Sequence, residues 1–302
     1  MKLILANNQS DQFKAFYADI ARTHNVALEY TDYASLLFTF DSEGASPISV
    51  NVTTTGRALT DYNGVYINGY LNTYELAITT ATCAQVLQVP FVNQELADSA
   101  SLSKLSMYAK LVAAGVRLPK TVAGSAQALL TVDDFVFPAV LKRADADRGI
   151  DNFMVRDLVA AKAILADQDS LSLWVLQEFV PNDGFYLVSF YHEEPAFCIF
   201  RTLEERPDGD ATKAHMFKPK GGTNASLIDL SKLQPSIMKE AHKALLAMNR
   251  QIGSVDCLYD PATDKTYILE VNYNPQLVTI ETFKDKRTAA FVRAMNRDWT
   301  KH

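Results

Sequence analysis

A carboxylate and a carboxamide lie two residues apart in an otherwise apolar stretch, Tyr267–Asn272. On a β-strand this spacing points Glu270 and Asn272 to the same face, because successive side chains alternate between the two faces. A second apolar run contains one acid, Asp256, and a turn-forming Asp-Pro-Ala-Thr-Asp segment separates the two runs. The sequence therefore predicts a hairpin with Asp256 opposite Glu270. Two carboxylates and one amide oxygen that converge in this way suit a hard cation such as Mg²⁺.

Two lysines stand where cations could meet an anionic ligand. Lys104 is near the start of a predicted helix over residues 101–114, and Lys142 ends an apolar run that begins at Phe137. Taken alone, each lysine would usually be a solvated surface residue, and each polar residue of the predicted hairpin would usually belong to a half-exposed strand. The case for a shared site depends on the rest of the chain.

The composition limits the class of protein. The chain has 302 residues, of which 48% are hydrophobic and 21% are charged, so we expect a globular protein of one large unit or two to three subdomains. A net charge of −6 argues against nucleic acid as a partner. The three cysteines are far apart, which favours reduced thiols and a cytoplasmic protein. The apolar runs are too short for a membrane span, so no membrane partner is expected.

The first 95 residues alternate between strands and helices. The predicted strands cover residues 2–6, 26–30, 48–52, 64–69 and 89–92, and the predicted helices cover residues 10–24 and 73–87. Such alternation predicts a small α/β domain with a largely parallel sheet. Farther along, predicted strands at 137–142, 152–155, 173–180, 185–191 and 195–202 are interleaved with helices at 125–130, 157–166 and 235–251. Between residues 203 and 224 charged residues are frequent, and this segment is either a solvated loop or part of a binding site.

In this order, the motifs of the C-terminal two-thirds resemble the ATP-grasp superfamily, in particular its ribosomal S6 glutamate ligase and glutathione synthetase-like carboxylate–amine ligases. The resemblance covers about residues 96–285 and depends on the order and spacing of short motifs. These motifs are Ser103-Lys104, Gly115-Val116-x-x-Pro119-x-Thr121, Phe137–Lys142, Gln177-Glu178-Phe179-Val180, Arg201, Gly221-Gly222, Val255-Asp256 and Leu269-Glu270-Val271-Asn272-x-Asn274-Pro275.

The resemblance implies a fold and a nucleotide site. It implies an α/β pre-domain over residues 1–95, then a two-subdomain ATP-grasp fold with antiparallel sheets, divided into a lid at 96–172 and a C-terminal subdomain at 173–302 that carries the metal site. ATP would lie between the two subdomains. The implied ligands are Lys104 and Lys142 for the phosphates, Glu178, Phe179 and Val180 for adenine, Asp183 for the ribose, and Asp256, Glu270 and Asn272 for Mg²⁺ or Mn²⁺.

The implied activity is that of an ADP-forming carboxylate–amine ligase, which makes an amide bond through an acyl phosphate. Its substrates would be a carboxylate-bearing amino acid or peptide and an amine, and Arg201 and Lys213 would hold the substrate carboxylate or the later oxyanion. A phosphotransferase and an ATP-binding protein without turnover are the alternatives. A homodimer is the default assembly.

Two positions depart from the pattern of these ligases. The loop after Lys142, usually rich in glycine, has only Gly149, and Leu187 stands where an Asp-x-Arg motif places arginine. The first departure bears on how the lid closes over phosphates. The second bears on substrate binding or turnover.

Overall fold

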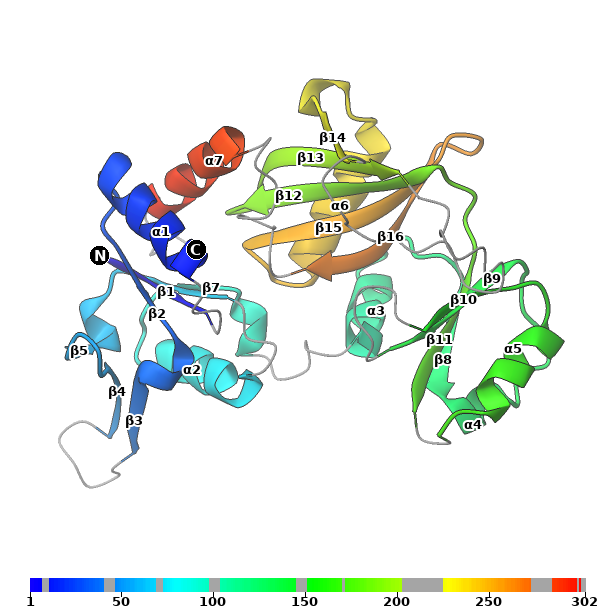
Figure 1. Cartoon of the computed structure of the whole chain (residues 1–302), viewed down its shortest axis with the longest axis horizontal. Helices are drawn as coiled ribbons and strands as arrows, with labels where there is room; N and C mark the ends of the chain where they lie inside the picture. The colour runs from blue at the N-terminus through cyan, green and yellow to red at the C-terminus, as the bar shows by residue number, and fades with distance from the viewer. Residues whose placement is uncertain are drawn as a thin grey trace.

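The computed structural model describes residues 1–6, 11–40, 47–68, 73–97, 104–144, 151–169, 172–202, 225–272, 284–297 and 299 (Figure 1). Four predicted features lie wholly or partly outside these residues. They are Ser103, residues 145–150 of the glycine-poor loop, the charged segment that contains Lys213 and Gly221-Gly222, and the Asn274-Pro275 end of the last motif.

The N-terminal part contains a four-stranded parallel sheet in the order β2-β1-β6-β7. Its strands and helices are β1 Lys2–Leu5, α1 Asp11–Thr23, β2 Leu28–Thr31, β6 Val65–Ile67, α2 Tyr74–Val86 and β7 Phe91–Val92. The predicted strand at residues 48–52 is β4, Ile48–Val52, and it lies outside this sheet. It pairs with β3, Leu36–Phe40, and β5, Arg57–Ala58, in a separate antiparallel sheet. Short 3-10 helices occur at η1 Tyr33–Ser35, η2 Leu59–Asp61 and η3 Gln94–Leu96.

The middle of the chain forms an antiparallel sheet in the order β10-β9-β11-β8. Its elements are β8 Thr121–Ser125, α4 Ala126–Leu129, β9 Ala139–Arg143, β10 Asn152–Val155, α5 Leu158–Ala166 and β11 Leu173–Glu178. The Asp157 carboxylate caps α5 by accepting a hydrogen bond of 2.8 Å from the Ala160 N–H, as its N-cap position predicts. Because β11 pairs with β8 and β9, this sheet extends to Glu178, beyond the predicted boundary at residue 172.

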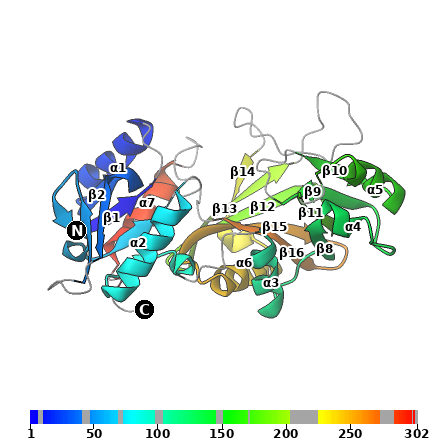
Figure 2. The same cartoon turned by 90° about the horizontal axis from the view of Figure 1, so that it is seen from below.

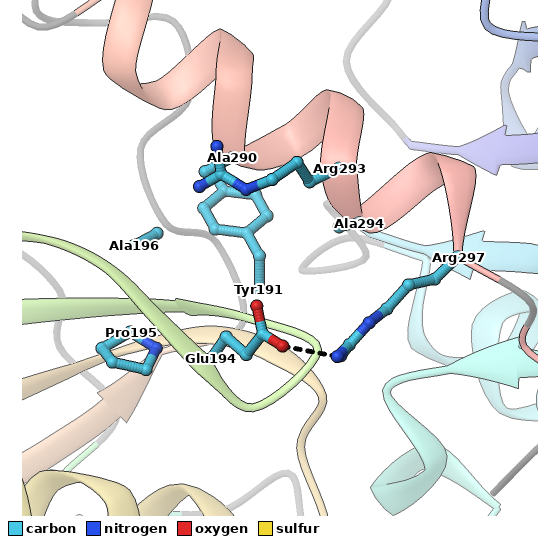
Figure 3. A pocket seen from close by; sticks show the side chains of 8 residues that line it. All are labelled: Tyr191, Glu194, Pro195, Ala196, Ala290, Arg293, Ala294 and Arg297. Atoms are coloured by element: carbon cyan, nitrogen blue, oxygen red, sulfur yellow. Dashed lines mark hydrogen bonds and ion pairs between the residues drawn. The ribbon is translucent and has the colours of Figure 1, made fainter.

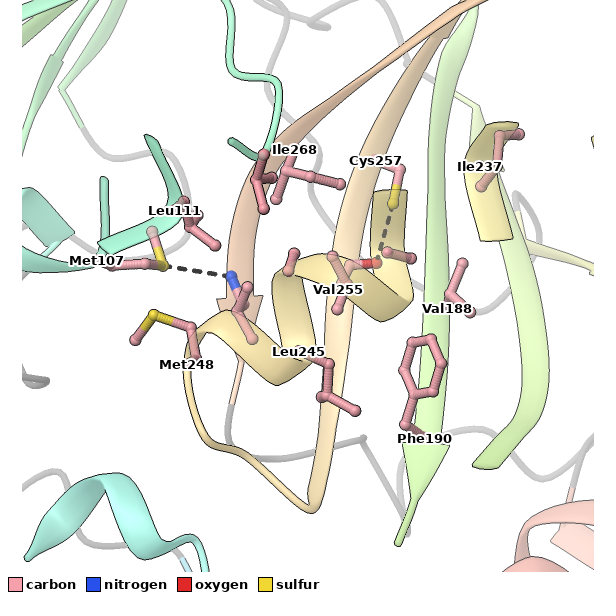
Figure 4. Close-up of a cluster of buried hydrophobic side chains, with 14 of the residues drawn as sticks. Met107, Leu111, Val188, Phe190, Ile237, Leu245, Met248, Val255, Cys257 and Ile268 are labelled. Atoms are coloured by element: carbon pink, nitrogen blue, oxygen red, sulfur yellow. Dashed lines mark hydrogen bonds between the residues drawn. The ribbon is translucent and has the colours of Figure 1, made fainter. Parts of the chain in front are cut away.

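The last sheet is antiparallel and has the order β14-β13-β12-β15-β16. Its elements are β12 Gly184–Tyr191, β13 Glu194–Thr202, β14 Ala225–Ile228, η4 Leu230–Lys232, α6 Pro235–Ala247, β15 Ile252–Asp260 and β16 Lys265–Asn272. Helix α3, Lys104–Ala113, lies with α6 on one face of this sheet, as Figures 1 and 2 show. Residues of α3, α6 and the sheet share one buried cluster, which includes Leu111, Leu245 and Val255 (Figure 4). The α/β and antiparallel architecture predicted from the sequence is therefore confirmed.

The C-terminal helix α7, Lys284–Asn296, packs against the N-terminal part of the chain (Figure 1). Its Phe291 ring lies 5.5 Å from the ring of Tyr17 on α1, and the Lys2 ammonium donates to the Met295 carbonyl. Just after α7, the Arg297 guanidinium pairs with Glu194 at the start of β13 beside a small pocket (Figure 3). The helix thus joins the N-terminal sheet to the last sheet.

A buried ion pair makes a second connection between the same two parts. The Arg250 guanidinium, which follows α6, lies 2.8 Å from the Glu95 carboxylate of η3, and both side chains are almost inaccessible to solvent. The Gln251 side-chain oxygen accepts a hydrogen bond of 3.0 Å from the Asn93 N–H. These contacts hold the end of the N-terminal part against the start of β15.

Cys83, Cys198 and Cys257 are buried free thiols, as the sequence predicts. Within the described ranges, the helices are too short or too polar to cross a membrane.

Candidate active site

The two carboxylates predicted to converge face each other across β15 and β16. Asp256 pairs with Glu270, and Ser254 pairs with Asn272, in the register of the two strands. The register shifts by one residue between this pair and the next, where Cys257 pairs with Ile268. Leu269 is thus the extra residue of a β-bulge, and it lies between Ile268, which faces the α6 core, and Glu270.

The bulge turns Glu270 toward the face of the sheet opposite α6. Ile268, Cys257 and Val255 belong to the buried cluster beneath the sheet, and side chains alternate along each strand. Asp256, Glu270 and Asn272 therefore share the other face. The predicted hairpin and its pairing of Asp256 with Glu270 are confirmed, whereas the metal-binding role of the three residues stays a prediction.

The surroundings of Asp256 fit a cation. Its Oδ1 atom is buried and makes no hydrogen bond with the residues that the structure describes. Burial, reinforced by the nearby Glu270 carboxylate and opposed by Arg201, raises the pKa of Asp256 to about 8. A divalent cation between the two carboxylates would offset both the lost hydration and the repulsion. The described residues contain no cluster of three or more His, Cys, Asp or Glu, so a cation here would depend on the two carboxylates and one carboxamide of the hairpin.

The two predicted phosphate-binding lysines interact electrostatically with each other, and Lys142 also interacts with Glu270 of this hairpin. Burial, followed by repulsion from Lys104, lowers the pKa of Lys142 to about 8, and attraction by Glu270 opposes the shift. The Lys142 ammonium lies 5.9 Å from the centre of the Tyr108 ring, and Tyr108 is one helical turn after Lys104 on α3. The structure thus brings together Lys104 of α3, Lys142 of β9 and Glu270 of β16.

Lys142 also contacts Gln177, the first residue of the motif that continues with Glu178, to which the sequence assigned no role. The Lys142 ammonium donates to the Gln177 Oε1 atom at 2.8 Å, and the Gln177 Nε2 group donates to the Thr121 hydroxyl at 2.9 Å. Gln177 is 3% exposed, on the apolar strand β11. Its polarity within that strand was the feature that could have identified it. Tyr108 was missed for a different reason. Its position one turn after Lys104 indicates a role only once Lys104 is known to lie near Lys142.

The residues predicted to bind adenine are Glu178, the last residue of β11, and the two residues that follow it, Phe179 and Val180. The Glu178 N–H donates to the Lys120 carbonyl at 2.8 Å, and the Phe179 N–H donates to the Pro138 carbonyl at 3.0 Å. Val180 is buried, and its carbonyl accepts a hydrogen bond of 2.6 Å from Asn182. Two of the backbone donors in this segment are therefore already used, and any pairing with a base would fall to the remaining backbone groups.

Asp183, predicted to bind the ribose, lies in the exposed turn before β12. Because the turn connects the middle sheet to the last sheet, Asp183 stands at the junction of the two. Lys213 lies outside the described residues.

Arg201 lies on β13, on the same face of the sheet as Asp256. The arginine is 5% exposed, and burial lowers its pKa while the attraction of Asp256 opposes the shift. Leu187 lies between the two, since it pairs with Asp256 on one side and with Ile199 of β13 on the other. The position where the sequence resemblance leads one to expect an arginine is thus a buried leucine, and Arg201 lies on this face on the next strand, β13.

A parallel N-terminal sheet followed by two antiparallel sheets is an architecture that this chain shares with solved ATP-grasp ligases. Comparisons with protein-family models and with the sequences of curated proteins find no match. The comparison with solved structures finds many chains that share the fold.

Three of these chains align with almost the whole protein. D-cycloserine synthetase DcsG is 17% identical, with 98% of this chain and 100% of that chain covered at a TM-score of 0.62. The ATP-grasp ligase PsnB, complexed with minimal precursor, Mg and ADP, is 14% identical, with 100% and 98% covered at a TM-score of 0.68. The D-alanine–D-alanine ligase of Bacillus anthracis is 13% identical, with 99% and 97% covered at a TM-score of 0.58. At these identities, the comparison establishes the ATP-grasp fold.

Proposed function

We propose that the protein is an ATP-dependent carboxylate–amine ligase that forms an amide bond through an acyl phosphate and releases ADP and phosphate. The observation that carries the proposal is that the Lys142 ammonium lies over Tyr108 of α3, the helix that begins at Lys104 and contacts β16, which carries Glu270. A triphosphate needs cationic partners before a second anion can approach it, and two lysines together with a hairpin that fits Mg²⁺ provide them. The shared fold with three named ligases or synthetases supports the same reaction class.

In this proposal, each group of the site has a defined task. Lys104 and Lys142 bind the phosphates of ATP, and Glu178, Phe179, Val180 and Asp183 hold the adenosine. Asp256, Glu270 and Asn272 hold Mg²⁺, which when bound would stabilise negative charge on the transferred phosphoryl group. Arg201, on the same face as Asp256, orients the substrate carboxylate toward the nucleotide.

The substrates are a carboxylate-bearing amino acid or peptide and an amine. Among the solved structures, one PsnB complex contains a precursor peptide and another chain is named for the ligation of D-alanine, so both sizes of substrate occur with this fold. Leu187 makes the centre of the face apolar where a second arginine would add positive charge. Arg201 is therefore the described guanidinium that we assign to the carboxylate. The homodimer and the cytoplasmic location stay predictions from the sequence.

The test is an assay of nucleotide release with the full chain, ATP, Mg²⁺ and panels of amino acids and peptides. A ligase should release ADP and phosphate only when both substrates are present, in step with amide formation. A protein that binds ATP without turnover would show no release of ADP that depends on substrate. A phosphotransferase would release ADP and leave a stable phosphorylated product.

Labelling the substrate carboxylate with heavy oxygen then tests the acyl phosphate. One labelled oxygen must leave the substrate with the phosphoryl group, so the label should appear in inorganic phosphate. Formation of AMP and pyrophosphate, or of phosphate without the label, would rule out the proposed intermediate.

A further inference from the structure

Lys142 ends a directional chain of hydrogen bonds through the middle sheet. The Thr121 hydroxyl donates to the Pro119 carbonyl at 2.7 Å, the Gln177 amide N–H donates to the Thr121 oxygen at 2.9 Å, and the Lys142 ammonium donates to the Gln177 oxygen at 2.8 Å. A backbone carbonyl can only accept a hydrogen bond, and an ammonium can only donate. Both ends of the chain therefore fix the direction of every bond in it.

This polarity determines how the Gln177 amide is oriented. If the amide were turned over, its N–H groups would point at the ammonium, and its oxygen would face a hydroxyl whose proton is already given to Pro119. Such an arrangement would break two of the three hydrogen bonds. The amide oxygen of Gln177 is thus held toward Lys142.

The fold places these side chains in reach of one another. Residue 177 of β11 pairs with Thr121 of β8 on one side and with Val140 of β9 on the other, and Lys142 lies two residues beyond Val140 on the same face. Lys142 and Gln177 are therefore diagonal neighbours, which long side chains can bridge. Because Gln177 is buried, water competes little for its amide.

We propose that Gln177 is a positioning residue, which holds the Lys142 ammonium toward the bound nucleotide and is itself oriented by Thr121. This inference rests on the proposed function, because it assumes that Lys142 binds a phosphate. A lysine has many rotamers, and fixing its ammonium before the nucleotide arrives reduces the entropy that binding must remove. The Tyr108 ring next to Lys142 restricts the same side chain from another direction.

The first step of the test is calorimetry of the ATP analogue AMPPNP with Mg²⁺ and the full chain. Lys142→Met should bind the analogue about tenfold to a hundredfold more weakly than the wild type, since a hydrogen bond between charged groups is lost. Lys120→Met is the matched control. The Lys120 ammonium lies over the Phe135 ring, and Lys120 contacts Glu178 only through its backbone N–H and carbonyl, which the substitution keeps. Equal binding by the wild type and Lys142→Met would overturn the phosphate-binding role, and the present inference with it.

The second step separates Gln177 from Lys142. Gln177→Leu should weaken AMPPNP binding about fivefold to tenfold in the wild-type background and should have no further effect in Lys142→Met, because the two residues act through one contact. With a turnover assay in hand, the KM for ATP should rise more than kcat falls. An equal loss in both backgrounds, or no loss while Lys142→Met binds weakly, would overturn the positioning role and leave the proposed function intact.

Two substitutions at Thr121 distinguish the loss of one hydrogen bond from a general loss of folding. Thr121→Ser keeps the hydroxyl and should bind AMPPNP like the wild type, whereas Thr121→Val has nearly the same shape but cannot accept from Gln177. Thr121→Val should weaken binding, and only when Gln177 is present. Two results would contradict the proposed series of hydrogen bonds. One is an equal loss of AMPPNP affinity in Thr121→Ser, and the other is an effect of Thr121→Val when Gln177 is already replaced by Leu.

Discussion

Asp256 lies opposite Glu270 because β16 has one more residue than β15 at this point of the hairpin. From Asp260 and Lys265 to Cys257 and Ile268 the pairing advances one residue at a time on both strands, and the next pair is Asp256 with Glu270. Without the extra residue, the partner of Asp256 would be Leu269. The bulge is therefore what places two carboxylates on one face, next to the lysines of α3 and β9.

Substituting Glu270→Gln removes one of these charges and keeps the shape of the side chain. We expect the variant to fold and to lose Mg²⁺-dependent turnover, because a neutral amide is a much weaker ligand for a hard cation. Magnesium titrations of nucleotide turnover provide the measurement. Asp264→Asn is the control, since Asp264 is an exposed acid in the turn of the same hairpin and should keep the metal dependence of the wild type. Unchanged activity in Glu270→Gln would remove Glu270 from the metal site.

Because the pKa of Asp256 is raised, we expect the folding stability of the metal-free protein to depend on pH. Its folded-state pKa, about 8, lies above the ordinary value of 3.8, so between these values the folded protein binds more protons than the unfolded chain. Stability then falls as pH rises through this window, because deprotonation is harder in the folded state. Asp256→Asn cannot ionise, and it should lose less stability than the wild type between about pH 5 and about pH 8.

Thermal unfolding with a chelator present measures this difference directly. Added Mg²⁺ should restore the stability of the wild type at about pH 8 and have little effect on Asp256→Asn, because binding to the folded state stabilises it. Parallel pH profiles for the two proteins would show that Asp256 does not titrate in this range.

The lowered pKa of Lys142 predicts how nucleotide binding depends on pH. The ammonium loses its proton as pH rises through about 8, so the affinity for AMPPNP should decline above that pH. Burial and Lys104 are the two causes of the lowering, and Lys104→Met removes the second. In that variant the decline should move to higher pH, although binding at neutral pH is weaker. Calorimetry from about pH 7 to about pH 10 tests both statements, and an unchanged midpoint would show that Lys104 does not act on Lys142.

The sequence predicted the parts of this site that depend on local pattern. The alternation of apolar and polar residues was enough to place Glu270 and Asn272 on one face, and the turn segment was enough to pair their strand with that of Asp256. The bulge at Leu269 could not be predicted, because the core beneath Ile268 and Val271 decides which residues of β16 face inward. Gln177 was missed because its partners, Thr121 and Lys142, come from two other strands of the sheet.

Element boundaries show a similar limit. The division at residue 172 came from the family resemblance and falls just before β11, whereas the pairing of β11 with β8 and β9 depends on contacts between distant strands. Residues 48–52 were correctly predicted as a strand, but local pattern carries no information about which sheet a strand joins.

Removing one partner of the buried Arg250–Glu95 pair should cost more stability than breaking an exposed ion pair, because it leaves a buried charge uncompensated. Glu95→Ala leaves a buried guanidinium without this carboxylate and should destabilise the protein by about 3–5 kcal/mol, as expected when one partner of a buried ion pair is removed. Asp19→Ala, which breaks the exposed pair with Arg22, should cost about 0–1 kcal/mol. Urea unfolding of both variants measures the difference, and similar midpoints would mean that the buried pair contributes little.

The packing of α7 on the N-terminal sheet affects the order in which the protein can mature on the ribosome. Tyr17 and Tyr66 are synthesised long before Phe291, whose ring packs against both of them. N-terminal domains generally fold first during synthesis, at about 5–20 residues per second. At the slower rate, tens of seconds pass between the synthesis of the first sheet and that of α7, which completes the cover of one of its faces. The part of this apolar face that α7 covers, beside α1, therefore stays exposed on the nascent chain until residues 284–296 have been translated.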